Sequence, residues 1–154
     1  MAAKRSAGIL LFRDTENGTE VLLGHMGGPF WARKDDHAWS LVKGEYLDDE
    51  EPETAARREF QEELGLPVPD GELVELGEVK QSGKVVTAWA LKADLDPADV
   101  VPGTFEMEWP PKSGQLKEFP ELDRVEWFDL DTARTKIVKG QAAFLDRLVA
   151  LPES

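Results

Sequence analysis

The chain has 154 residues, a length most simply explained by one domain, residues 1–154, with a core of its own. Its formal net charge of −13 argues against broad binding to nucleic acid or to an anionic membrane, since both need a basic surface. Because it contains no cysteine, disulfides, a thiol nucleophile and cysteine-ligated zinc are excluded.

The N-terminal part predicts a β-hairpin, because apolar runs at residues 6–13 and 20–25 flank the turn dipeptide Asn17-Gly18. The first run does not alternate with polar residues, which indicates a strand covered on both faces. It is too short for a signal peptide, and no stretch is long enough to span a membrane, so we expect a cytoplasmic location. His25 is expected to be a hydrogen-bonded structural residue, with contact to a leaving group as the alternative.

Residues 26–38 form a loop rich in glycine, proline and charge, for which two interpretations are open. In the first, the loop is a structured surface segment with Phe30 and Trp31 packed beneath it. In the second, it is a wall of a substrate pocket, where a ring such as Trp31 stacks on a base and Arg33 or Lys34 contacts phosphate.

A short strand at residues 39–42 leads into Lys43 and Gly44. Glycine permits a sharp bend of the backbone at this point, and Lys43 is a plausible phosphate contact. A helix follows, with Pro52 suited to its first turn and Gly65 as its stop signal.

Three carboxylates of this helix, those of Glu59, Glu62 and Glu63, share an arc of roughly 100°. Phe60 and Leu64 form an apolar stripe beside them. Two carboxylates about 6 Å apart, at an effective dielectric of about 20, repel by on the order of 3 kcal/mol. The arc is therefore either a solvated acidic face or a site for a hard divalent cation, which accepts carboxylate oxygens and bridges to phosphates.

Beyond the helix, two strands are expected at residues 71–80 and 85–95. Residues 96–120 contain many prolines and little sign of a regular element. They form either an ordered lid, with Trp109 or Phe105 stacking on substrate, or a long loop that these rings anchor to the core.

The last segments are a strand at residues 124–130 and helices at residues 131–139 and 141–151. The order of elements predicts an α+β fold in which one mixed sheet has helices on both faces.

One spacing pattern extends well beyond the acidic helix. A glycine is followed after five residues by Glu, and after seven more by Arg-Glu-apolar-X-Glu-Glu-X-Gly-apolar. The pattern spans 23 residues and resembles the signature of the Nudix hydrolases, and every specified position is filled: Gly44, Glu50, Arg58, Glu59, Phe60, Glu62, Glu63, Gly65 and Leu66. The resemblance implies an αβα sandwich and a loop-helix-loop metal site that hydrolyses a nucleoside diphosphate linked to another group.

The resemblance also implies roles for individual residues. Mg²⁺ or Mn²⁺ would be held by the Gly44 carbonyl and by Glu59, Glu62 and Glu63, with Glu59 and Glu62 counted among the catalytic residues. The base that deprotonates the attacking water would be Glu59 or a downstream glutamate, for which the candidates are Glu118 and Glu121. Arg58 and Glu50 would form a supporting ion pair.

The expected activity is hydrolysis of a nucleoside triphosphate or a dinucleoside polyphosphate, and the sequence does not decide between them. The tyrosine typical of diadenosine polyphosphate hydrolases, 16–18 residues beyond the signature, is absent at residues 82–84. The alternatives are a Nudix-like sensor that binds nucleotides without cleaving them and an inert domain with a fortuitous acidic helix. The expected partner is a small nucleotide, with no polymeric nucleic acid and no membrane, and the oligomeric state stays open.

Overall fold

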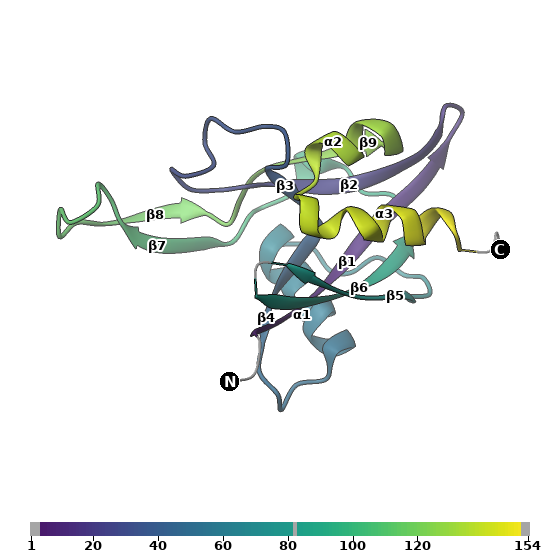
Figure 1. Ribbon diagram of the computed structural model, residues 1–154, viewed down its shortest axis with the longest axis horizontal. Coiled ribbons are helices and arrows are strands. Elements are labelled where there is room, and N and C mark those ends of the chain that lie inside the picture. Colours follow the sequence, from purple (N-terminus) through teal and green to yellow (C-terminus); the bar gives the residue numbers. More distant parts are fainter. Residues whose placement is uncertain (1–3, 82, 152–154) are drawn as a thin grey trace.

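The computed structural model describes residues 4–81 and 83–151 and shows one mixed β-sheet with helices on both faces (Figure 1). Its strands are β1 (Lys4–Thr15), β2 (Gly18–Met26), β3 (Trp39–Ser40), β4 (Val42–Tyr46), β5 (Val74–Gln81), β6 (Lys84–Lys92) and β9 (Leu122–Asp129). Their order is β3-β2-β1-β6-β5, with β4 also paired to β1 and β9 to β2. Strands β1 and β6 run parallel, and the other strand pairs run antiparallel.

Strand β1 lies at the centre of the sheet and is buried on both faces. Ile9 and Leu11 pack in one core cluster together with Phe60, whereas Leu10 packs in the other cluster together with Phe144. Successive side chains of a strand point to opposite faces. The continuous apolar run is therefore confirmed as a strand covered from both sides. The hairpin is also confirmed, although its turn is formed by Glu16 and Asn17, because Gly18 already pairs with Thr15 as the first residue of β2.

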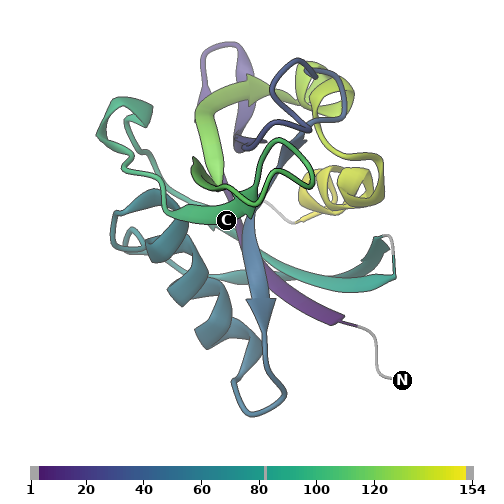
Figure 2. The same ribbon diagram turned by 90° about the vertical axis from the view of Figure 1, so that its left-hand side faces the viewer.

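The helices form the two outer layers of the sandwich. Helix α1 (Pro52–Leu64) begins on a proline and ends where Gly65 adopts a left-handed conformation, with φ of 67°. On the opposite face lie α2 (Leu130–Lys136) and α3 (Ala142–Val149), linked by the short 3₁₀ helix η2 (Lys139–Gln141). Figure 2 shows α1 and these two helices on opposite sides of the sheet.

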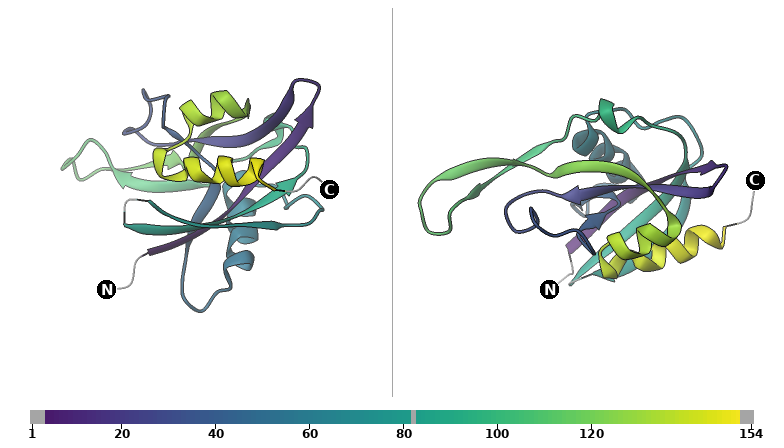
Figure 3. Two further views of the ribbon diagram at one scale, coloured as in Figure 1. Left: turned by 45° about the vertical axis from the view of Figure 1, so that its right-hand side comes forward. Right: turned by 90° about the horizontal axis from the view of Figure 1, so that it is seen from above.

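Residues 96–120 contain regular structure, so the expectation of an irregular loop was wrong. A 3₁₀ helix, η1 (Pro97–Asp99), precedes the antiparallel hairpin of β7 (Thr104–Glu108) and β8 (Leu116–Pro120). This hairpin, which we call the arm, projects from the body of the molecule (Figure 3). Phe105 and Met107 alternate with exposed glutamates along β7, the period of a half-buried strand, but prolines on both sides hide this short pattern.

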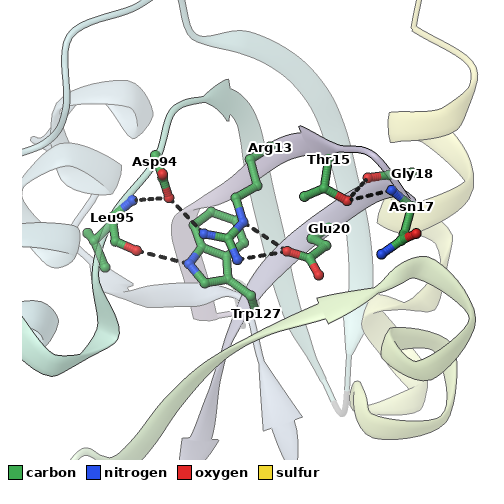
Figure 4. Close-up of polar contacts among 8 residues, drawn as sticks. All are labelled: Arg13, Thr15, Asn17, Gly18, Glu20, Asp94, Leu95 and Trp127. Atoms are coloured by element: carbon green, nitrogen blue, oxygen red, sulfur yellow. Dashed lines mark hydrogen bonds and ion pairs between the residues drawn. The ribbon is translucent and has the colours of Figure 1, made fainter.

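Near the C-terminal end of β1 lies a cluster centred on Arg13 (Figure 4). The Arg13 guanidinium lies 4.2 Å from the ring centroid of Trp127 and pairs at 2.8 Å with both Glu20 and Asp94. The indole Nε1 of Trp127 donates a hydrogen bond of 2.9 Å to the Leu95 carbonyl. The cluster therefore ties β1 and β9 to the segment that follows β6.

Among the described residues, no helix combines the length and the apolar character needed to cross a bilayer.

Candidate active site

Gly44 lies directly against the acidic helix. It belongs to β4, opposite Ala7 of β1, and α1 packs across it. A Cβ atom at Gly44 would lie 2.0 Å from Oε2 of Glu59, which is far inside van der Waals contact. The expected sharp bend at this glycine is therefore wrong. The strand continues through it, and the position requires glycine because the Glu59 carboxylate occupies the space of a side chain.

Arg58 connects three glutamates. Its Nε and Nη2 atoms donate to the two carboxylate oxygens of Glu50 at 2.8 and 2.9 Å. Its Nη1 atom donates to Glu59 at 2.8 Å and to Glu62 at 3.1 Å. The sequence indicated an ion pair with Glu50 alone, because helical spacing does not predict how far the long side chain of an arginine extends over neighbouring acids.

Glu59 and Glu63 are carboxylates whose charge is poorly compensated. Burial, together with the charges of Glu121, Glu59 and Glu62, raises the pKa of Glu63 to about 8. Burial also raises the pKa of Glu59, although its hydrogen bond from Arg58 acts in the opposite direction. The site therefore combines desolvation with an excess of negative charge, which is the combination that functional sites often show.

Of the two downstream glutamates, the structure brings Glu121 to the acidic helix. Its charge raises the pKa of both Glu59 and Glu63, and partial loss of hydration raises its own pKa. Glu118 instead lies exposed on β8 of the arm, directly opposite Glu106.

The backbone fixes Glu121 at the foot of the arm. Its N–H donates to the Gly103 carbonyl at 2.8 Å, and its carbonyl accepts from the Gly27 N–H at 2.9 Å. The Gly103 N–H in turn donates to the Glu63 carbonyl at 3.4 Å. Added Cβ atoms would lie 1.8 Å from the Pro120 carbonyl oxygen at Gly27 and 2.8 Å from the Glu62 carbonyl oxygen at Gly103. Both glycines are thus required by close backbone contacts that join the arm, the loop and α1.

Lys43 provides positive charge beside the acids. Loss of hydration, followed by the nearby charge of Lys84, lowers the pKa of its amine, while Glu45, Glu63 and Glu59 raise it. The half-buried ammonium is therefore within electrostatic reach of two predicted metal ligands, and the structure brings these residues together as expected.

The loop at residues 26–38 matches the first interpretation at Trp31 but not at Phe30, and its role as a wall of a substrate pocket stays a prediction. Trp31 packs against the core, with the Lys34 amine 5.1 Å from its ring centroid, whereas Arg33 is exposed. Phe30 is 64% exposed and contacts Trp109 of the arm. Sequence reasoning chose Trp31 as the ring facing the ligand and overlooked Phe30 as the partner of Trp109, because no local pattern links two residues so far apart in the chain.

His25 has a structural role, as expected. It is buried, and its two ring nitrogens contact Asp123 at 2.7 Å and the Lys34 carbonyl at 2.6 Å. These contacts hold the loop against β9.

A hollow of about 540 Å³ lies next to the Arg58–Glu50 pair. None of the three helix acids predicted as metal ligands lines it, so it adjoins the acidic site only through Arg58. Across residues 4–81 and 83–151, no three His, Asp or Glu side chains converge closely enough to hold a metal ion as they stand. Two of the three helix acids instead share Nη1 of Arg58.

A family model described as the NUDIX domain matches residues 2–148. The chain belongs to the Nudix family. Members of this family are hydrolases that act on pyrophosphate bonds, and they generally use divalent metals such as Mg²⁺. The resemblance inferred from the signature and the predicted α+β sandwich are both confirmed.

Solved structures show the same fold. A C. elegans Ap4A hydrolase in a binary complex is 22% identical with a TM-score of 0.66, and the alignment covers 96% of each chain. The M. smegmatis Nudix hydrolase RenU is 23% identical with a TM-score of 0.61, over 100% of this chain and 91% of that one. The Nudix domain of Shewanella oneidensis NrtR, in complex with ADP ribose, is 16% identical with a TM-score of 0.61, over 97% and 88%. No curated protein matches the sequence.

Proposed function

We propose that this Nudix protein is a divalent-metal-dependent pyrophosphohydrolase that cleaves a P–O–P bond in a nucleoside triphosphate or a dinucleoside polyphosphate. The observation that carries the proposal is the excess of carboxylates around Gly44. The charges of Glu59, Glu63 and Glu121 interact there, and Glu62 shares Arg58 with Glu59. The charge of Arg58 opposes the rise in the pKa of Glu59, and that of Lys43 opposes the rise in the pKa of Glu63 and Glu121.

The donor set fits Mg²⁺ or Mn²⁺, which prefer carboxylate and carbonyl oxygens. Glu59 and Glu62 already share one positive centre, Nη1 of Arg58, and Glu63 is an acid whose charged form lacks compensation. In this proposal, Glu59, Glu62, Glu63 and the Gly44 carbonyl hold the ion. When bound, the ion would offset negative charge on the phosphate oxygens and make the attacking water more acidic.

We assign proton transfer to Glu121. An oxygen of water forms a bond to one phosphorus, the bond from that phosphorus to the bridging oxygen breaks, and the water proton goes to the carboxylate. The raised pKa of Glu121 brings it closer to neutral pH, which suits a general base. Glu59 is the alternative base, but its carboxylate is bound to Arg58 and packed against Gly44.

Lys43 is the proposed phosphate contact nearest the acids, and Arg33 and Lys34 of the loop add positive charge farther out. An ammonium placed beside the carboxylates can bind a phosphate that bridges to the ion. The C. elegans neighbour is an Ap4A hydrolase and the NrtR domain binds ADP ribose, and both compounds contain a nucleoside diphosphate. We propose a ligand of this class for the present protein. We also propose that residues 1–154 form a single domain.

The test is hydrolysis of a nucleotide panel with Mg²⁺, followed as phosphate products, for the wild type and for Glu62→Gln/Glu63→Gln. We expect turnover in the wild type and a loss of several orders of magnitude in the double variant, with an unchanged circular dichroism spectrum. Equal turnover in the two proteins would refute the assignment. Nucleotide binding without any cleavage by the wild type would instead identify a sensor module.

A further inference from the structure

Phe30 and Trp109 meet across the gap between two segments that are far apart in the chain. Phe30 belongs to the loop at residues 26–38, and Trp109 directly follows β7 of the arm. Their ring centroids lie 6.1 Å apart with the planes at 70°, an edge-to-face pair. The pair therefore connects the outer part of the loop to the outer part of the arm.

The core does not account for this pair. Trp31, the next residue, packs against the core, but Phe30 belongs to neither core cluster and is 64% exposed. Closer to the foot of the arm, the loop and arm already pack together, since a Cβ on Gly28 would lie 3.0 Å from the Phe105 ring. The contact at Phe30 is thus an additional, solvent-exposed one, made by two large rings that belong to neither core cluster.

Two aromatic faces from separately anchored segments suit a planar ligand. Every nucleobase has a π-face, and stacking on protein aromatics is favourable for all of them. Arg33 is exposed on the same loop, and the Lys34 amine lies over Trp31, so positive charge for phosphate groups is close by.

The distance along the arm indicates which part of a ligand would bind here. Trp109 lies five residues beyond Thr104, the first residue of β7, and Thr104 is paired with Pro120, the neighbour of Glu121. At the rise of a β-strand, five residues cover roughly 17 Å. A ligand that reaches from Glu121 to Trp109 is therefore extended, with several linked groups between the cleaved bond and the ring.

We propose that Phe30 and Trp109 form a clamp for the nucleobase at the far end of an extended nucleoside polyphosphate. The inference rests on the proposed function for its choice of substrate. It adds a specificity-determining residue, Phe30, and a role for the arm, which is to hold the base while its foot carries Glu121. The base enters between the two rings and replaces their edge-to-face contact with stacking.

The experiment measures binding and hydrolysis separately. Binding of AMP, which has no anhydride bond, is measured by calorimetry up to millimolar concentrations. Hydrolysis is measured with diadenosine tetraphosphate and with inorganic tripolyphosphate, which has no base. The variants are Phe30→Ala, Trp109→Ala and Phe30→Tyr, the last of which retains an aromatic ring. Leu116→Ala is the matched control, because Leu116 is 69% exposed on the opposite face of the same arm.

We expect Phe30→Ala and Trp109→Ala to raise the Kd for AMP and the KM for diadenosine tetraphosphate by roughly tenfold, the usual effect of losing one stacked ring. Phe30→Tyr and Leu116→Ala should match the wild type, as should tripolyphosphate with every variant. AMP that fails to bind the wild type, or binds Phe30→Ala equally well, overturns the clamp.

The two proposals fail in different ways. If the wild type cleaves no nucleotide but Phe30→Ala binds AMP more weakly than the wild type, the proposed hydrolase activity is wrong and the clamp is supported. If Phe30→Ala cleaves diadenosine tetraphosphate with an unchanged KM, the proposed hydrolase activity is supported and the clamp is wrong.

Discussion

Two arginines of this molecule each organise a cluster of acids, and the clusters differ in how much negative charge they leave uncompensated. Arg13 stacks on Trp127 and pairs with Glu20 and Asp94 (Figure 4). Arg58 makes five hydrogen bonds to three glutamates, and further carboxylates act on the same site. One cation faces two acids in the first cluster, whereas in the second Arg58 shares its charge among Glu50, Glu59 and Glu62 while Glu63 and Glu121 lie nearby.

The pKa of Asp94 beside Arg13 is shifted in the opposite direction to those of the buried acids near Arg58. The hydrogen bond from Arg13 lowers the pKa of Asp94, so that carboxylate is held in its charged form. In the active-site region, burial raises the pKa of Glu59, Glu63 and Glu121. A cluster in which both acids pair directly with the cation supports the fold, whereas one with unbalanced buried acid is suited to recruit a cation.

The largest expected effect that tests this comparison comes from removing one acid from each region. Glu121→Gln should lower kcat by about 10²- to 10⁴-fold, because the proposed proton acceptor is lost. Glu20→Gln in the Arg13 cluster should leave kcat unchanged. Steady-state assays on purified, folded variants provide the measurement.

Glu118→Gln is the matched control for Glu121→Gln, since Glu118 lies on the arm three residues earlier in the chain. Its kcat should equal that of the wild type. A large loss in Glu118→Gln together with normal turnover in Glu121→Gln would move the proton acceptor onto the arm and contradict our assignment.

A smaller effect should follow from replacing each arginine by lysine, which keeps the charge and removes the planar fork. Arg58→Lys cannot maintain the contacts to Glu50, Glu59 and Glu62 together, so we expect kcat to fall about tenfold as the ligands lose their orientation. Arg13→Lys should lower the free energy of unfolding by about 1 kcal/mol through lost stacking and pairing, with unchanged kcat. Thermal unfolding and activity are measured on both variants, and a change of kcat in Arg13→Lys would contradict the separation of the two regions.

The smallest effect concerns pH. Because Arg13 depresses the folded-state pKa of Asp94 below 3.8, its contribution to stability is present above that pH and disappears as the pH falls through the folded value. Asp94→Asn should therefore lower the free energy of unfolding at pH 7 by a few tenths of a kcal/mol, a small amount because the pair is exposed to solvent. At pH 2.5 the variant and the wild type should be closer in stability. Denaturant titrations at both pH values test this, and a difference that grows in acid would show that the sign is wrong.

Elements with a strong local pattern could be predicted from the sequence. The apolar run of β1 predicted a strand buried on both faces, and Pro52 and Gly65 mark the ends of α1. Asp129 precedes α2 and accepts a hydrogen bond of 2.7 Å from the Thr132 N–H, as capping rules favour. In each case the physical cause lies within a few neighbouring residues, so periodicity and capping rules apply.

Features that depend on tertiary contacts could not be predicted in the same way. The need for glycine at position 44 comes from the Glu59 carboxylate on a different element, although a bend was the local explanation. The strands of the arm are short and lie among prolines, which predict a loop. The alternation of exposed and half-buried residues along β7 covers too few residues to indicate a strand against that signal. The choice between Glu118 and Glu121 depends on where β8 ends, because this strand ends at Pro120 and so includes Glu118 but not Glu121.

The contacts at the foot of the arm divide the hairpin into two parts with different tolerance to change. Main-chain hydrogen bonds join Gly27, Glu121 and Gly103 and continue to the Glu63 carbonyl of α1. At Gly27 and Gly103, even one added methyl group would clash with a backbone carbonyl. The far turn at residues 109–115 lies outside these contacts. Evolution or protein engineering can therefore exchange that turn for others of different length and composition without disturbing these main-chain contacts. Under the proposed function, such an exchange would change which compounds are bound and leave the acidic site in place.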